Sequence, residues 1–170
     1  MNKQFCLIVM FITLMPISLF SQDSVALKRN EIKLNVGYLL GGYPEISYER
    51  VLNEESSVGL STGVNIENSD YKFNFIPYYR VYFGKKPAAG FFMEGNLALF
   101  SLKRTEYDYR RGIQTYTNFL GFGAGIGLGG KFITKNGFIA ELLGGLGRNF
   151  VNTNVINVYP RFGISIGKRF

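Results

Sequence analysis

Apolar and polar residues alternate with a period of two along most of the chain. This is the period of a β-strand, in which successive side chains point to opposite faces of a sheet. No window beyond the N-terminal segment has the sustained period of a helix. Counting alternating runs bounded by turn or loop residues predicts eight strands, at residues 31–40, 45–52, 57–66, 71–83, 91–102, around 121–130, 138–148 and 156–170.

The lengths of the strands and of their connections predict how the strands are arranged. Each segment has roughly the ten residues that a tilted strand needs to cross a bilayer. The connections after the second, fourth and sixth segments are compact turns. Those after the third, fifth and seventh are polar or long, and residues 103–116 form the longest predicted loop. Short turns on one side and longer loops on the other are typical of outer-membrane barrels. The predicted fold is therefore all-β, an eight-stranded antiparallel up-and-down transmembrane β-barrel.

The sixth segment, GFGAGIGLGG, has glycine at every second position. Gly125, Gly127 and Gly130 match the G-x-G-x-x-G pattern of dinucleotide-binding loops. That pattern requires a helix after it, and here the strand-like alternation continues instead. We therefore interpret the glycines as the inner face of a narrow barrel, where side chains barely have room. The apolar residues between them, such as Ile126 and Leu128, then face outward.

A soluble lipocalin-like barrel with an apolar interior is the alternative to a membrane barrel. Its outer face would have to be rich in charged residues. The second face of the sixth and seventh segments holds glycines with Ile139 and Leu143, and is too bare for a water-exposed exterior. The pattern therefore favours a membrane barrel, whose outer face contacts lipid, over a soluble barrel.

With the apolar face outward, charged residues of both signs point into the lumen. Four are acids and four are bases: Glu31, Lys33, Glu49, Arg80, Glu94, Lys131, Glu141 and Arg161. Because isolated buried charges are costly, we expect neutralising pairs, with Glu94 and Glu141 meeting Arg80 or Arg161 across the lumen. One interpretation is a proton or ion path. A structural plug of salt bridges, packed around Tyr78 and Tyr82, is favoured because polar interiors are usual in such barrels.

The N-terminal segment predicts export. Lys3 provides a positive start, residues 5–20 are mostly apolar, and Ser21 is a small residue at a cleavage site. This is the pattern of a secretory signal peptide. We divide the chain into a signal peptide at residues 1–21, a short periplasmic segment at 22–30 and the barrel domain at 31–170.

Composition excludes several kinds of site. The chain of 170 residues has no histidine, and its single cysteine, Cys6, lies in the signal peptide. We therefore predict no catalytic residues, no cofactor and no metal site, since no nucleophile–base set is present. The formal net charge of +7 falls to +6 without Lys3. We expect this positive surface to face anionic lipid headgroups rather than nucleic acid.

Aromatic residues gather near the predicted strand ends. Phe83, Phe91 and Phe138 lie toward the predicted periplasmic side, and Tyr71 and Phe119 toward the other side. Aromatic belts at the two membrane interfaces explain this distribution. A stacking surface for nucleic acid or sugars is the competing interpretation.

Several segments resemble known barrel proteins. The end of the chain, YPRFGISIGKRF, resembles the carboxy-terminal strand signal that outer-membrane barrels present to their assembly machinery, with Phe170 as its final aromatic residue. The segments ISYERVLNEESSVGLSTG, GFFMEGNLAL and GFIAELLGGLG resemble strand units of small outer-membrane β-barrel domain proteins of the Bacteroidota type. The resemblance covers residues 31–170. It implies a location in the outer membrane of a Gram-negative bacterium, with membrane lipid and the assembly machinery as partners.

The sequence thus predicts a non-enzymatic integral outer-membrane protein. Its role would be structural, or would involve an unknown extracellular partner that binds residues 103–116 and 150–155. The alternative is a narrow conduit or binding barrel for small amphiphilic molecules, because the low bulk of the sixth strand could leave a cavity. The sequence predicts a structural rather than a catalytic role for six lumen charges: Glu49, Arg80, Glu94, Lys131, Glu141 and Arg161.

Overall fold

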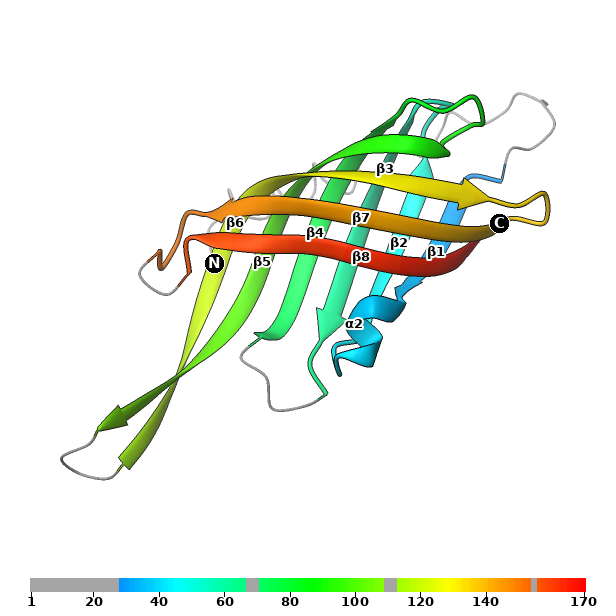
Figure 1. Ribbon diagram of the computed structural model, residues 1–170. Coiled ribbons are helices and arrows are strands. Elements are labelled where there is room, and N and C mark those ends of the chain that lie inside the picture. The colour runs from blue at the N-terminus through cyan, green and yellow to red at the C-terminus, as the bar shows by residue number, and fades with distance from the viewer. Residues whose placement is uncertain (1–27, 67–70, 109–112, 154–155) are drawn as a thin grey trace, which may run out of the picture.

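The chain folds into a closed barrel (Figure 1). The computed structural model describes residues 28–66, 71–108, 113–153 and 156–170, and the side chains among these except those of Tyr71 and residues 104–116. The predicted signal peptide lies outside the described residues. The strands are β1 (Asn30–Asn35), β2 (Glu45–Val51), β3 (Ser56–Val64), β4 (Tyr71–Tyr82), β5 (Gly90–Asp108), β6 (Ile113–Ile133), β7 (Phe138–Asn149) and β8 (Val158–Arg169).

Every strand pairs antiparallel with its neighbours in chain order, and β1 pairs with β8 to close the ring. The closing register places Glu31 opposite Arg169 and Asn35 opposite Ser165. The predicted all-β fold of eight antiparallel up-and-down strands is therefore confirmed.

The alternation of the sequence becomes an inner and an outer face. Along β7 and β8 nearly every second residue is buried in the lumen, and those between are exposed. The lumen holds the core, which includes one apolar cluster around Phe92 and Tyr82 and another around Phe100 and Tyr159. Pro77, which cannot donate a ladder hydrogen bond, lies opposite Leu60 of β3, in the interval where the pairing of β4 with β5 is interrupted.

The two ends of the barrel differ. The connections β2–β3, β4–β5 and β6–β7 lie with the start of β1 and the end of β8, and we call this the turn end. The connections β1–β2, β3–β4, β5–β6 and β7–β8 lie at the opposite end, which we call the loop end.

The first predicted strand was too long. β1 ends at Asn35, and the chain continues as a short helix, α2 (Val36–Leu40), which packs against β8. The Asn35 side chain accepts a hydrogen bond from the Tyr38 backbone N–H, which is the geometry of a helix N-cap. The alternation of Val36, Tyr38 and Leu40 is too short to distinguish a helical turn from a strand, and the cap and the packing against β8 both favour the helix.

The prediction that residues 103–116 form a loop is also wrong. β5 and β6 continue into residues 103–116 and stay paired as far as Asp108 opposite Ile113. The resulting two-stranded ribbon projects beyond the rest of the barrel (Figure 1). Threonine and tyrosine are frequent in this segment, and both favour strands, which outweighs the charge that suggested a loop.

The alternating glycines of β6 make room for aromatic rings in the lumen. A Cβ atom at Gly121 would overlap the Phe100 ring, one at Gly123 would overlap Tyr159, and one at Gly129 would overlap Phe92. In contrast, a Cβ atom at Gly130, on the opposite face, would meet nothing within 4 Å. The period-two glycine pattern thus reflects how little space an eight-stranded barrel has inside.

Adjacent glycines provide a matched test of this space. We expect Gly129→Ala to lower the free energy of unfolding by about 1–3 kcal/mol, because the new methyl group meets the Phe92 ring and the Leu142 carbonyl. Gly130→Ala should leave stability unchanged or slightly raised. Reversible unfolding of both variants in detergent or lipid measures the difference. Equal effects at the two positions would contradict the assignment of the inner face.

Candidate functional site

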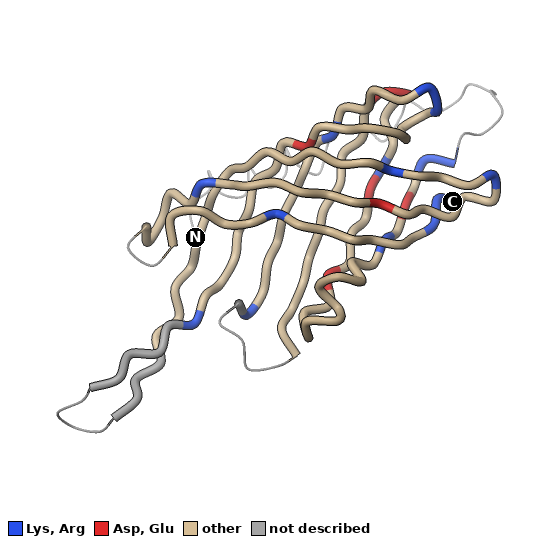
Figure 2. The backbone as a smooth tube through the Cα atoms, in the orientation of Figure 1, with Lys and Arg blue, Asp and Glu red and all other residues tan. Residues whose placement is uncertain are grey.

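Ten charged side chains are buried among the described residues, and all lie on the inner face of the strands. Five are acids and five are bases, so their formal charges sum to zero: Glu31, Glu45, Glu49, Glu94, Glu141, Lys33, Arg80, Lys131, Arg161 and Arg169. Figure 2 shows acidic and basic positions intermixed along the barrel. We call these ten residues the lumen charge network.

Glu49 of β2 lies at the centre of this network. One carboxylate oxygen, Oε2, lies 2.6 Å from Lys33 Nζ and 2.9 Å from Arg80 Nη1. The other, Oε1, lies 2.6 Å from Lys131 Nζ. The hydroxyl groups of Tyr78 and Tyr82 donate to the same carboxylate at 3.1 and 2.6 Å. Three cations from β1, β4 and β6 therefore converge on one buried acid, as a buried carboxylate requires.

Arg80 of β4 connects Glu49 to two further acids. Its guanidinium lies 2.7 Å from Glu94 and 2.8 Å from Glu141. It also lies between two aromatic rings, 4.4 Å from the Tyr78 centroid and 4.3 Å from the Phe92 centroid. Such cation–π contacts add stabilisation in a desolvated site.

Glycines on the walls make this stacking possible. The Phe92 ring occupies the space left by Gly129, and the Tyr78 ring occupies the space left by Gly59. The small residues of β3 and β6 therefore help to position Arg80.

Toward the turn end, the network continues through Lys131 and Glu31 to the last residues of β8. Lys131 Nζ lies 2.8 Å from Glu31, whose other oxygen lies 2.6 Å from Arg169 Nη2. Arg169 also donates to the backbone carbonyls of Pro87 and Ala88 at 2.9 and 2.8 Å. These contacts fasten the β4–β5 turn across this end of the lumen.

Toward the loop end, the network continues through Glu94 to Arg161 and Glu45. Arg161 Nε donates to Glu94 at 3.1 Å, and Arg161 Nη1 lies 3.1 Å from Glu45. The third nitrogen, Nη2, donates to Ser61 at 2.9 Å. Acids and bases thus connect in one series from Arg169 at the turn end to Glu45 near the loop end.

The structure brings the eight charges that the sequence placed inward into this single network. Glu94 contacts both Arg80 and Arg161, and Glu141 contacts Arg80. Sequence reasoning missed Glu45 and Arg169. Both could have been found from the period of two, since Glu45 shares a face with Glu49, and Arg169 shares one with Arg161. Phe170 lies outside the network, 53% exposed, with its backbone hydrogen-bonded to Asn30.

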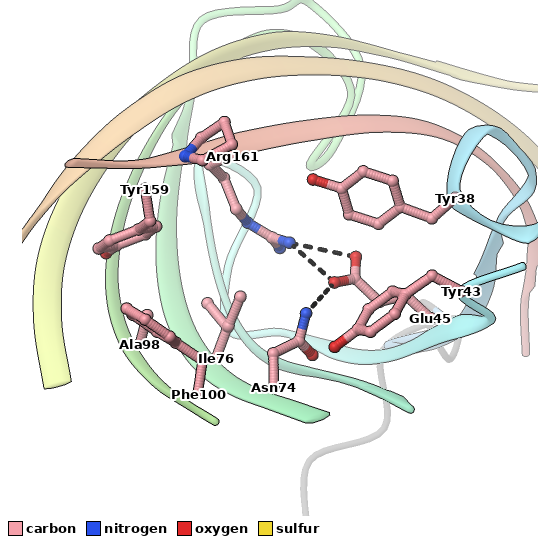
Figure 3. Close-up of a pocket in the computed structure, with 10 residues that line it drawn as sticks. Tyr38, Tyr43, Glu45, Asn74, Ile76, Ala98, Phe100, Tyr159 and Arg161 are labelled. Atoms are coloured by element: carbon pink, nitrogen blue, oxygen red, sulfur yellow. Dashed lines mark hydrogen bonds and ion pairs between the residues drawn. The ribbon is translucent and has the colours of Figure 1, made fainter. Parts of the chain in front are cut away.

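A cavity of about 250 Å³ lies beyond the network, toward the loop end (Figure 3). Its apolar wall comes from Ile76, Ala98, Phe100 and Tyr159, and its polar side from Glu45, Asn74 and Arg161, with Tyr38 and Tyr43 at its border. Burial, together with the neighbouring Glu45 carboxylate, raises the pKa of the Tyr38 phenol. Tyr38 is therefore a protonated donor at neutral pH.

The described residues offer no metal site, because no group of three or more Asp, Glu, His or Cys side chains has the required arrangement. In the same part of the chain, no helix has the length and apolar character needed to span a bilayer. The acids and bases of the lumen charge network neutralise one another. Each carboxylate faces cations or amide and hydroxyl donors.

The fold is similar to that of the N-terminal β-barrel domain of OprF from Pseudomonas aeruginosa. The two structures superpose with a TM-score of 0.55 at 17% sequence identity, and the match covers 84% of this chain and 98% of that domain. No protein-family model matches the chain. No curated protein matches it in sequence. At this identity the likeness shows a shared eight-stranded barrel.

Arg80 provides a test of the network. We expect Arg80→Ala to lower the free energy of unfolding by about 3–5 kcal/mol, because Glu49, Glu94 and Glu141 would lose a shared counter-ion in a desolvated lumen. Arg148 of β7 is an exposed arginine on the outer face, and Arg148→Ala should change stability by no more than about 0.5 kcal/mol. Urea unfolding of the barrel in lipid measures both. A mild effect of Arg80→Ala would show that the network does not stabilise the barrel.

Proposed function

We propose that this chain is a non-enzymatic integral outer-membrane β-barrel of a Gram-negative bacterium, with a closed lumen. The main support for the proposal is that charged side chains are buried and large apolar side chains are exposed, the opposite of a soluble globular protein. The buried charges among the described residues lie inside, whereas large apolar side chains such as Ile126, Leu142 and Leu146 are 57–73% exposed outside. Soluble monomers rarely expose apolar patches above a few hundred Å². A lipid environment explains an apolar exterior on every side of a barrel.

Exposed aromatic residues support the same proposal. Phe83, Phe91, Phe132, Phe138 and Phe170 all lie near the turn end and are 51–75% exposed. They form the kind of belt that outer-membrane barrels place at a membrane interface. The fold likeness to the OprF barrel domain supports the same class. We propose that the turn end faces the periplasm, because short turns usually lie on that side.

The proposal extends to export and assembly. Residues 1–21 would be removed as a signal peptide, and Phe170 would contribute to recognition by the outer-membrane assembly machinery. Its exposed side chain at the end of β8 is consistent with that role. The strand segments that resemble Bacteroidota barrel proteins favour an origin in that group.

For the biological role, we propose structural support or a surface interaction at the loop end. Among the described residues, the β5–β6 ribbon projects beyond the rest of the barrel at the loop end (Figure 1), and it would reach an extracellular partner. The conduit alternative has less support, because the network from Arg169 to Glu45 occupies the lumen.

Leu97 tests the lipid-facing surface. Leu97 is 48% exposed on β5, and Leu97→Arg should lower the free energy of unfolding in lipid by about 2–4 kcal/mol if the site lies near the midplane. Leu97→Ala should cost less, because lipid still covers the position. A soluble barrel would tolerate the arginine on its wet exterior.

Leu52 is the matched control, since it is 44% exposed just beyond β2 at the turn end. Leu52→Arg should cost only about 0–1 kcal/mol, as expected near an interface. Heat-modifiable gel migration and resistance to urea extraction complete the test. Recovery of the wild-type chain as a soluble periplasmic monomer would overturn the proposal.

The closed lumen makes a second prediction. Liposomes that contain the purified barrel should swell in small sugars no faster than empty liposomes, because Glu49, Arg80 and Lys131 fill the cross-section with paired side chains. Swelling that increases with the amount of protein would instead support the conduit alternative.

A further inference from the structure

The cavity toward the loop end has a shape and a lining suited to a small ligand. Its volume is about 250 Å³. An engineered apolar cavity of about 150 Å³ is sufficient to bind benzene, so this one has room for a ring with a small substituent. Phe100 and Tyr159 lie with their ring centroids 5.5 Å apart, beside Ala98 and Ile76. The two rings are tilted by 54° to one another, and together these four side chains provide an apolar wall (Figure 3).

One polar group that lines the cavity lacks a partner. Asn74 is 8% exposed, and its Oδ1 atom is buried with no hydrogen-bond partner among the described residues. The amide orientation is fixed by chemistry, because Asn74 Nδ2 donates to the Glu45 carboxylate at 2.9 Å, where an amide oxygen would be repelled. A buried acceptor without a donor is costly. The oxygen has almost no accessible surface, so a ligand that donates to it must draw the Asn74 side chain slightly toward the cavity that this residue lines.

The charged groups beside the cavity do not require a charged ligand. Arg161 uses its three nitrogen atoms on Glu94, Glu45 and Ser61. Glu45 accepts from Arg161, Asn74 and Asn35 in return. An anion would therefore have to compete with existing ion pairs, and a cation would find Glu45 already neutralised.

Apart from the Tyr38 phenol at the border of the cavity, which can donate, the remaining hydrogen-bonding capacity of the lining is that of acceptors. The Tyr159 hydroxyl donates to Asn96 Oδ1 at 2.8 Å, so its oxygen can accept but has no further proton to donate. Asn74 Oδ1 is likewise an acceptor. The site thus matches a ligand that brings its own O–H or N–H group.

We propose that this cavity is a binding site for a small, uncharged, ring-sized molecule that carries a hydrogen-bond donor. The apolar body packs against Phe100, Tyr159 and Ala98, and the donor binds Asn74 Oδ1. Tyr38 and Tyr43, whose rings meet edge to face with centroids 5.9 Å apart, border the site. The proposal concerns a ligand within the barrel, and it does not depend on any partner at the loops.

The test uses three probes of similar size and different polarity on the whole barrel in lipid nanodiscs. Phenol carries a donor, toluene lacks one, and benzoate carries a negative charge. Each is titrated while backbone amide resonances are followed by NMR, with empty nanodiscs as the control for partition into lipid. We expect saturable shifts for phenol at Asn74, Ala98 and Tyr159, about two- to tenfold weaker binding of toluene, and no saturable binding of benzoate.

Two variants localise the binding. Ala98→Leu fills part of the cavity without replacing a charged residue and should abolish saturable phenol binding. The matched control is Ala140→Leu, the same change at an exposed position on the outer face of β7, which should leave phenol binding unchanged. Asn74→Leu should remove the preference for phenol over toluene.

The outcomes are decisive in either direction. The proposal is overturned if phenol produces no saturable shifts at the cavity, if toluene or benzoate binds as well as phenol, or if Ala98→Leu still binds phenol. If Ala98→Leu does not fold, the shift map and the probe ranking of the wild-type barrel decide alone. Heat-modifiable migration of the same samples reports separately whether the barrel itself is intact.

Discussion

A charged carboxylate can remain inside a narrow barrel only when cations and hydrogen-bond donors surround it. Glu49 satisfies this requirement with Lys33, Arg80 and Lys131, which come from three other strands. The positions of these three cations in turn determine where Glu31, Glu94 and Glu141 can lie. The lumen charges are therefore organised around one acid. The rings beside its partner Arg80 occupy the space left by Gly59 and Gly129, whereas Gly121 and Gly123 make room for Phe100 and Tyr159.

Most of the fold could be predicted from the sequence, because the polarity of each strand residue indicates whether its side chain faces the lumen or the exterior. The alternation along β7 and β8 gave both the strands and the direction of each side chain. The failures occurred where the pattern is short or where the decisive contact is local. At Val36–Leu40, the Asn35 cap and packing against β8 accompany a helix where the alternation predicted more strand. At residues 103–116, pairing between β5 and β6 continues through a segment whose charge resembled that of a loop.

The candidate site was readable in part. The inward face of each charge follows from the period of two, but the partners depend on the stagger between strands, which no local pattern specifies. Thus Glu45 could have been included from its spacing to Glu49, whereas its pairing with Arg161, 116 positions away, could not. The cavity was still less accessible to sequence reasoning, because it arises from Phe100 and Tyr159 lying against glycines of other strands.

The pairing of Glu31 with Arg169 joins residues from the first and the last strand. In a bilayer this contact would favour the closed barrel over an open sheet. A sheet whose two edges have not yet met would leave Glu31, Lys33 and Arg169 short of counter-ions, next to unpaired backbone edges in hydrocarbon. Both penalties disappear in the same step, when the two edges meet. In the proposed membrane location, an open sheet is therefore penalised in both respects relative to the closed barrel.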